Sequence, residues 1–300
     1  MTAPHVVILL ENLPVTRDRR VWREACALRD ARFAVTTICP RSPGEPASFE
    51  RDGVEIRTFP TASERSQVIG FVWEYAVAWA WMLRLLLKVG HERRIDGVQA
   101  CNPPDIFFLH GLLARLKGAA FVFDQHDLAP ELYETRFGRR GLIHRILRLC
   151  ERLTYRAADR VVATNDSYKA AAIERGRLRP DRVVVVRNGP DPDTMRPGPV
   201  DEDLRSGRDH LVVWMGNMGP QDGVDDALRA VAYLVHELDR HDCSFAFIGQ
   251  GEVLEDLRQM ACDLDIEAFV TFTGWIPDRD AFALLSSATI GLSADPPGPL

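Results

Sequence analysis

A repeated alternation of short apolar runs and helical stretches is the sequence feature that most limits which fold this chain can adopt. Residues 5–10 form an apolar run typical of a buried strand, a helical pattern follows, and residues 33–39 give a second strand. The same order recurs over residues 97–123. Strands joined through helices by short connections imply right-handed parallel crossovers. We therefore expect an α/β fold with a doubly wound sheet in the first half.

The second half repeats this pattern after a stretch rich in proline and glycine. Proline and glycine gather in this way at linkers between domains, which few contacts cross. A strand at residues 211–215 restarts the alternation, and the chain stops just after an apolar run at residues 289–293. We expect two tandem Rossmann-like domains, the second incomplete. Their predicted extents are residues 1–190 for the N-terminal domain, 191–209 for the hinge and 210–300 for the C-terminal domain.

Charge is divided unevenly between the two halves. Residues 1–196 carry 31 basic and 24 acidic side chains, a net charge of +7, whereas residues 197–300 carry 6 and 19, a net charge of −13. We therefore expect the halves to face different partners. Nucleic acid is not an expected partner of this chain. The six cysteines form no CxxC pair, which favours a reducing cytosol, and the first residues lack the basic start of a signal peptide.

Two helical segments raise the question of a membrane surface. Residues 68–89 are rich in tryptophan but too often interrupted by charge to cross a bilayer, so this helix either packs on the sheet or enters lipid headgroups. Residues 136–156 are expected to form one helix with arginines on one face and leucines on another. The arginine face could meet an anionic membrane, steer a phosphorylated substrate or simply be solvated.

A polar cluster follows the strand that begins at residue 120. Asp124, His126 and Asp127 cannot all be buried without partners, because an isolated buried charge costs several kcal/mol. We expect them at the carboxyl end of the strand, beside a crevice of the kind that holds ligands in open α/β sheets. The residues alone leave two interpretations of His126: a ligand contact, or a histidine satisfied by Asp124 or Asp127 that does no chemistry.

Glycine-rich turns precede helices in the second half. Gly249 and Gly251 would let backbone amides approach a phosphate or ribose at a helix N-terminus. By contrast, residues 12–20 contain no GxGxxG. A nicotinamide-dependent dehydrogenase is therefore not favoured.

Seven segments in order resemble glycosyltransferase family 4, which has the two-domain GT-B architecture. They are LPVTRDRRVWREA, ACNPPDIFFL, FVFDQHDLAPELY, VVATNDSYKAAAIERG, VVRNGPD, MGPQDGVDDAL and VTFTGWIP, and they span essentially the whole chain. The resemblance is to the bacterial branch that builds surface polysaccharides. It implies a retaining hexosyltransferase-type enzyme that moves a sugar from a nucleoside diphosphate, UDP by expectation, to a lipid-linked or saccharide acceptor at the inner membrane face.

The resemblance also assigns residues. The N-terminal domain is expected to hold the acceptor and the C-terminal domain the nucleotide sugar, with His126 as the catalytic candidate that contacts the donor sugar. The donor or nucleotide candidates are Gly216, Asn217, Asp222, Gly249, Gly251, Trp275, Ile276, Arg187 and Asn188. The candidates for acceptor or phosphate binding are Arg17, Arg19, Arg20 and Asn102.

The chain departs from the family pattern in two places. Asn217 and Asp222 stand where many relatives have an arginine and a lysine for the diphosphate, so Arg187, a cation from beyond residue 300 or a divalent metal is expected to neutralise it. Asp222 suits a metal or a hydroxyl better than a phosphate. The acidic pair that binds the donor in this family is expected after Leu300. One alternative is a truncated, non-catalytic remnant that at most binds nucleotide. Another is a UDP-sugar 2-epimerase, which shares the two-domain architecture.

Overall fold

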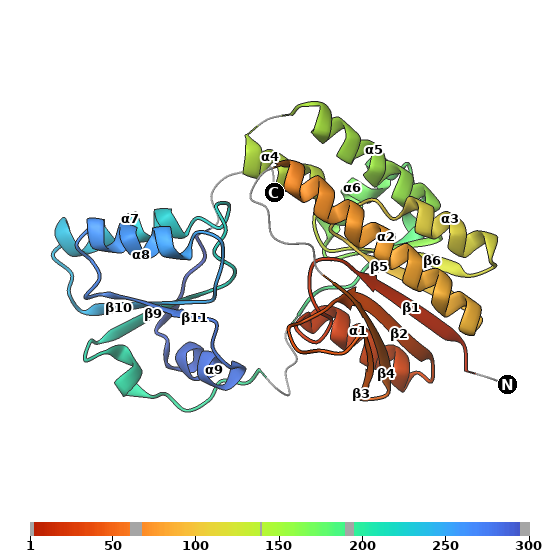
Figure 1. Ribbon diagram of the computed structural model, residues 1–300. Helices are drawn as coiled ribbons and strands as arrows, with labels where there is room; N and C mark the ends of the chain where they lie inside the picture. Colours follow the sequence, from red (N-terminus) through yellow and green to blue (C-terminus); the bar gives the residue numbers. More distant parts are fainter. Residues whose placement is uncertain (1–2, 61–67, 139, 190–194, 295–300) are drawn as a thin grey trace. The chain divides into compact units, whose positions relative to one another are not determined.

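The computed structural model shows a chain divided between Asn188 and Gly189 into two compact units (Figure 1). It describes residues 3–60, 68–138, 140–189 and 195–294. The predicted hinge, residues 191–209, falls within the second unit, and its first residues lie outside the described part.

Unit 1 is built on an eight-stranded sheet in the order β3-β4-β2-β1-β5-β6-β7-β8, in which only β3 is antiparallel. The strands β2 to β4 lie on one side of β1, and the strands β5 to β8 lie on the other side. The carboxyl ends of β1 and β5 therefore form the switch point at which open α/β sheets bind ligands. The strands are β1 His5–Leu10, β2 Ala34–Pro40, β3 Ser48–Arg51, β4 Val54–Phe59, β5 Gly97–Cys101, β6 Ala120–Gln125, β7 Arg160–Ala163 and β8 Val183–Val185.

Helices cover both faces of this sheet (Figure 1). Side chains of β1 alternate between two cores: Val7 and Leu9 belong to one, while Ile8 and Leu10 belong to the other. A strand buried on both faces is typical of a doubly wound sheet, as expected from the sequence. The helices are α1 Arg19–Asp30, α2 Val68–Glu92, α3 Phe108–Leu116, α4 Ala129–Phe137, α5 Leu142–Ala157, α6 Asp166–Gly176 and the 3-10 turn η1 Pro180–Arg182.

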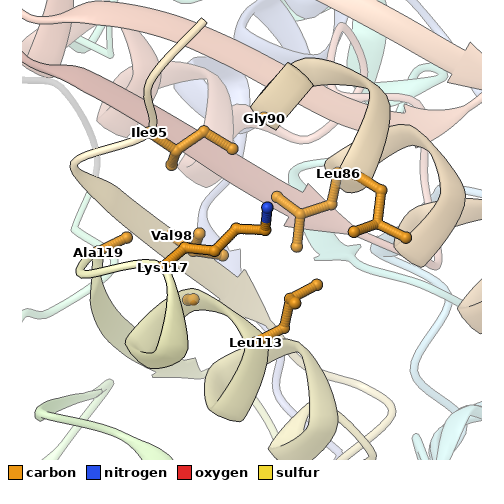
Figure 2. Close-up of a pocket in the computed structure, with 9 residues that line it drawn as sticks. Leu86, Gly90, Ile95, Val98, Leu113, Lys117 and Ala119 are labelled. Carbon is orange, nitrogen blue, oxygen red and sulfur yellow. The ribbon is translucent and has the colours of Figure 1, made fainter. Parts of the chain in front are cut away.

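The tryptophan-rich helix α2 packs on the sheet. Met82 and Leu86 are buried in the core, and the indole nitrogen of Trp79 donates to the carbonyl oxygen of Ile106 at 3.0 Å. Between the end of α2 and α3 lies a small apolar pocket, shown in Figure 2. Its cavity of about 20 Å³ could admit one water molecule and is far too small for a nucleotide. Among the described residues, no helix has the length and apolar content needed to cross a membrane.

One local prediction was wrong, and one pair of strands was not predicted. The single helix expected over residues 136–156 is two helices, because Gly138 adopts a left-handed conformation with a φ of 63° that ends α4. The hairpin formed by β3 and β4 was missed altogether. The sequence signal for this hairpin was the pair Asp52-Gly53, which favours a two-residue turn. In the structure both residues have the positive φ that such a turn requires.

Unit 2 is a smaller sheet of the same kind, with four parallel strands in the order β11-β10-β9-β12. Apolar clusters lie on both of its faces. The last strand is shorter than the predicted 289–293. The elements are η2 Glu202–Arg205, β9 His210–Met215, α7 Val224–His236, β10 Cys243–Ile248, α8 Leu254–Asp263, β11 Val270–Gly274, α9 Asp278–Ser287 and β12 Ile290–Gly291.

Candidate functional site

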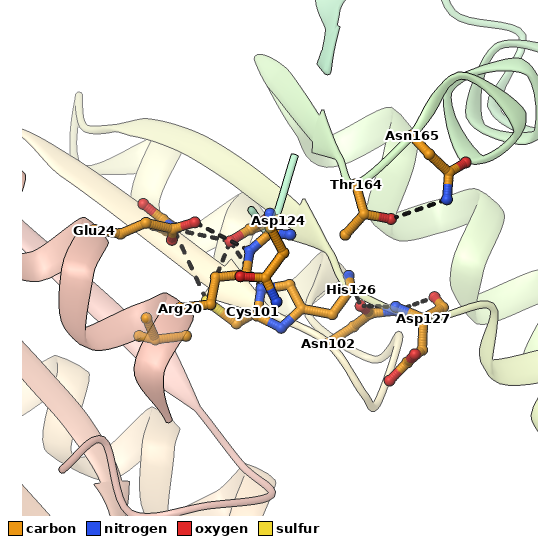
Figure 3. Close-up of polar contacts among 12 residues, drawn as sticks. Arg20, Glu24, Cys101, Asn102, Asp124, His126, Asp127, Thr164 and Asn165 are labelled. Atoms are coloured by element: carbon orange, nitrogen blue, oxygen red, sulfur yellow. Dashed lines mark hydrogen bonds and ion pairs between the residues drawn. The ribbon is translucent and has the colours of Figure 1, made fainter. Parts of the chain in front are cut away.

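A buried polar cluster lies at the carboxyl ends of β5 and β6 in unit 1, beside the switch point (Figure 3). Asp124, the penultimate residue of β6, has no exposed surface. Its carboxylate accepts hydrogen bonds from Arg20 Nη2 at 2.5 Å, from His126 Nε2 at 2.9 Å and from Gln99 Nε2 at 3.2 Å. Burial alone would raise the pKa of Asp124, but the hydrogen bond and charge of His126 and the charge of Arg20 lower it.

Glu24 is a second carboxyl group in this cluster. It lies one turn after Arg20 on α1, and it accepts from Arg20 Nε at 3.1 Å and from Gln99 Nε2 at 2.6 Å. Burial and the nearby charge of Asp124 raise the pKa of Glu24 to about 7. The cluster therefore places Asp124, whose ionised form is favoured, beside Glu24, whose protonated form is favoured.

His126 stands at the edge of the cluster, with its side chain 14% exposed. Burial would lower the pKa of its imidazole, but the hydrogen bond and charge of Asp124 outweigh this effect and raise it. Because Asp124 accepts from Nε2, a neutral ring carries its proton on that nitrogen and leaves Nδ1 as an acceptor. Nδ1 has no hydrogen-bond partner among the described residues.

Asn102 holds the main chain of this site. Its side-chain oxygen accepts from the backbone N–H of His126 at 2.6 Å and of Asp127 at 3.1 Å. Its side-chain nitrogen donates to Asp105 Oδ1 and to the carbonyl oxygen of Asp127, both at 2.7 Å. Each hydrogen-bonding position of the amide is therefore used by the protein, and the expected role of Asn102 in acceptor or phosphate binding is not supported.

The three arginines expected to bind an acceptor or phosphate differ in their exposure to solvent. Arg17 and Arg19 are exposed, but Arg20 is 6% exposed and is paired with Asp124 and Glu24. The structure does not favour phosphate binding by Arg20, because its guanidinium is buried and already pairs with two carboxyl groups. The contact between Arg20 and Asp124 was missed, although a glutamate at i+4 from an arginine and a glutamine inside an apolar strand were visible signs.

Two residues expected to bind the donor nucleotide lie near the end of unit 1. Arg187 is exposed and donates from Nη2 to Asp166 Oδ2 at 3.0 Å. Asn188 accepts from Arg23 Nη2 at 2.9 Å. An exposed ion pair of this kind is weak, so Arg187 can exchange Asp166 for another anion at little cost.

Cys101, Asp124 and His126 could form a metal site by distance alone, because their ligand atoms lie within 4.8 Å of one another. Their chemistry does not fit a metal. The guanidinium of Arg20 already occupies Asp124, and burial together with the charge of Asp124 raises the pKa of the Cys101 thiol, so the sulfur stays protonated. We therefore interpret the cluster as a network of hydrogen bonds between side chains.

Glycine-rich turns meet at the carboxyl edge of the unit 2 sheet. Gly216 N donates to the carbonyl oxygen of Ile248, and Gly249 N donates to that of Gly274, both at 3.0 Å. A Cβ atom on Gly249 would overlap the carbonyl oxygen of Gly216, and one on Gly251 would overlap that of Met218. These glycines therefore let the turns pack on each other, whereas the sequence pattern had assigned them to the approach of a phosphate or ribose.

The remaining candidates of unit 2 also lie at this edge. The carboxylate of Asp222 accepts from Gly219 N at 2.7 Å and closes its own loop before α7. Asn217 is exposed, and Ile276 packs partly buried on an apolar cluster. Trp275 follows β11 directly and is 71% exposed, which leaves its ring available for stacking.

Two protein-family models match the chain, one over most of unit 1 and the other over most of unit 2. Residues 18–189 match the family described as "Glycosyl transferase 4-like domain", and residues 201–293 match "Glycosyl transferases group 1". No curated protein sequence matches the chain.

Solved structures share the fold at low sequence identity. Sucrose-phosphate synthase from Thermosynechococcus elongatus has a TM-score of 0.76 at 14% identity, over 99% of this chain and 77% of that one. HepE from Anabaena in complex with UDP-glucose has a TM-score of 0.69 at 16% identity, over 99% and 75%. WaaG, described as a glycosyltransferase involved in lipopolysaccharide biosynthesis, has a TM-score of 0.69 at 19% identity, over 96% and 74%.

Proposed function

The chain belongs to the glycosyl transferase 4-like family, and we propose that it moves a hexose from a UDP sugar to an acceptor with retention of the anomeric configuration. The observation that carries this proposal is the position of His126. Its imidazole stands at the carboxyl end of β6, beside the switch point of the unit 1 sheet, and it keeps one ring nitrogen without a partner among the described residues. That nitrogen is suited to a hydroxyl group of a donor sugar.

Unit 2 is proposed to bind the nucleotide. Its three turns present an exposed tryptophan, Trp275, at the edge where a parallel sheet binds ligands, and an aromatic ring there can stack on a base. Similar solved structures hold UDP-glucose in one case and UDP-2-fluoro glucose in another. Arg187 is the candidate cation for the diphosphate within this chain, since Asn217 and Asp222 supply none.

Binding of the donor is testable without knowledge of the acceptor. We expect UDP and UDP-glucose to raise the Tm of the protein, because a ligand that binds only the folded state stabilises it. Trp275→Ala should weaken UDP binding roughly 10-fold, as expected for loss of one base–aromatic stack. The matched control is Trp73→Ala, which removes an exposed tryptophan of unit 1 and should leave the affinity unchanged.

The outcomes separate this proposal from its alternatives. A panel of UDP and GDP sugars that leaves the Tm unchanged would contradict donor binding. Binding without turnover in the presence of lipid-linked and saccharide acceptors would indicate a non-catalytic remnant. Conversion of the UDP sugar to its epimer without any acceptor would indicate a 2-epimerase.

The acceptor is proposed to be lipid-linked or a saccharide of the cell surface, met at the inner membrane face. The support is a set of exposed aliphatic side chains on α3 and α5, two helices that contact each other. They are Leu109, Leu112, Leu116, Leu142, Ile146 and Leu149. Arg145 and Arg156 are exposed on the same helix α5. This mixture of leucine and arginine suits an anionic lipid surface, where each basic residue contributes about 1 kcal/mol.

Membrane binding is predicted to depend on these leucines. We expect the protein to sediment with vesicles containing anionic lipid, and less so in high salt, because salt screens surface charge over ~8 Å at physiological ionic strength. Replacing Leu142, Ile146 and Leu149 together by serine should reduce the bound fraction severalfold. Leu238→Ser, at an exposed leucine of unit 2, is the control. Equal recovery in the supernatant with and without vesicles would remove membrane attachment and leave the donor proposal intact.

A further inference from the structure

Helix α1 sends two charged side chains toward the sheet, and the proposed function uses neither. The helix begins where the Asp18 carboxylate caps it by accepting from Arg20 N at 3.0 Å and from Val21 N at 2.9 Å. This cap fixes the first turn, which carries Arg20, and the next turn carries Glu24. Arg20 reaches Asp124 near the carboxyl end of β6, 104 positions later, and Glu24 reaches Gln99 in β5, 75 positions later.

The contacts run in one continuous path from α1 to the imidazole. Arg20 uses Nε for Glu24 and Nη2 for Asp124, so the two carboxyl groups share one guanidinium. Gln99 bridges the same two carboxyl groups from β5. The second Asp124 oxygen, Oδ2, is the atom that accepts from His126 Nε2. Asp124 therefore cannot rotate away from His126 without breaking its contacts with Arg20 and Gln99.

The charges of these side chains depend on one another. One guanidinium faces two carboxyl groups, so the cluster is neutral only if Glu24 or His126 carries an additional proton. Groups this close titrate together, and a change at one of them moves the others. The titratable groups around His126 are Asp18, Arg20, Glu24, Cys101, Asp124 and Asp127.

We propose that Arg20 and Glu24 are positioning residues for His126: acting through Asp124, they fix the proton of the neutral ring on Nε2 and so determine that Nδ1 is the atom offered to a ligand. With a neutral ring Nδ1 accepts a hydrogen bond, for example from a sugar hydroxyl, and with a charged ring it donates one, for example to a phosphate oxygen. The meaning of this choice for transfer rests on the proposed function, but the state of the ring can be measured without it.

The experiment is ¹⁵N NMR of the histidine-labelled protein. His126 is one of eight histidines, and its signals are assigned by their loss in His126→Gln. In the native protein we expect the neutral ring to carry its proton on Nε2. Glu24→Gln removes a negative charge and should lower the pKa of His126 by roughly 1 unit, whereas Arg20→Gln removes a positive charge and should raise it by a similar amount.

Two controls separate positioning from a purely structural contact. Arg20→Lys keeps the charge, so it should restore most of the native titration of His126. Asp30→Asn makes the same carboxylate-to-amide change as a Glu24→Gln exchange, on the exposed side of the same helix, and should leave the titration unchanged. If Glu24→Gln and Arg20→Gln lower the Tm but leave both the tautomer and the pKa of His126 as in the native protein, the two residues only join α1 to the sheet and the proposal is wrong.

A kinetic measurement adds the connection to transfer. Once a donor is identified, Glu24→Gln is expected to lower kcat about 10-fold while the Kd for UDP stays unchanged, because the nucleotide is proposed to bind unit 2. A loss of UDP affinity equal to the loss of kcat would contradict a role through His126. The NMR result stands whether or not the donor proposal holds, so the two can fail separately.

Discussion

Asp124→Asn is expected to lower sugar transfer at least about 100-fold and to reduce the free energy of unfolding by about 3–5 kcal/mol. The amide keeps the shape of the carboxylate but has a donor where the native group only accepts, so it favours the wrong tautomer of His126. It also removes the shorter of two ion pairs of the buried Arg20 guanidinium, which keeps its pair with Glu24. Turnover and denaturant unfolding measure the two effects.

The pH dependence of stability gives a second measurement of the same substitution. The pKa of Asp124 is lower in the folded protein than in the unfolded chain, so its ionised form stabilises the fold above about pH 4, and this contribution is lost as the pH falls. Asp124→Asn should therefore lose less stability than the native protein on acidification. The control is Asp30→Asn, at an exposed carboxylate. An Asp124→Asn protein with native stability and turnover would show that the buried pair holds neither the fold nor the ring.

Gly249→Ala is expected to destabilise unit 2 by more than about 3 kcal/mol. The residue has a φ of 132°, which side chains other than glycine rarely tolerate, and a Cβ atom would overlap the carbonyl oxygen of Gly216. Both causes act on the packed turns at the edge of the sheet, so UDP binding should be lost as well. Hydrogen exchange should show faster exchange in β10 and β11, while β5 and β6 of unit 1 keep their protection.

The matched control for this substitution is Gly291→Ala. This glycine lies in β12 of the same unit and has no positive φ, and a methyl group added to it would meet no atom within 4 Å. Its replacement should change stability by no more than about 0.5 kcal/mol. Equal stability of the two variants would show that the turns can move apart, and that their close packing does not shape the nucleotide site.

The fold could be predicted from the sequence because its signals are local. The strand at Gly97–Cys101 is the one expected, since an apolar run bounded by polar residues needs no distant information. The orientation of α5 could not be predicted in the same way. Its leucines at 142 and 149 and the isoleucine at 146 form an apolar stripe, but the face that packs inward carries Glu151, Thr154 and Tyr155. Only the neighbouring helices decide which stripe of a helix is covered.

The candidate site was predictable only in part, for the same reason. Asp124 and His126 could be placed at a strand end, because polar residues that follow a buried strand gather at the carboxyl edge of a parallel sheet. The partner of Asp124 was not identified: the sequence showed local signs of a polar network, but Arg20 lies 104 positions away and stands among exposed arginines. Burial distinguishes Arg20 from Arg17 and Arg19, and burial is a property of the folded chain.

The bonds made by Asn102 have a consequence for redesign. Because this side chain holds the backbone N–H groups of both His126 and Asp127, the path of the turn is set by a neighbouring strand end and not by the imidazole itself. The side chain at position 126 can therefore be exchanged without removing the bonds that hold its backbone. A library of side chains at this one position would vary the chemistry offered to a substrate while the scaffold beneath it stays in place.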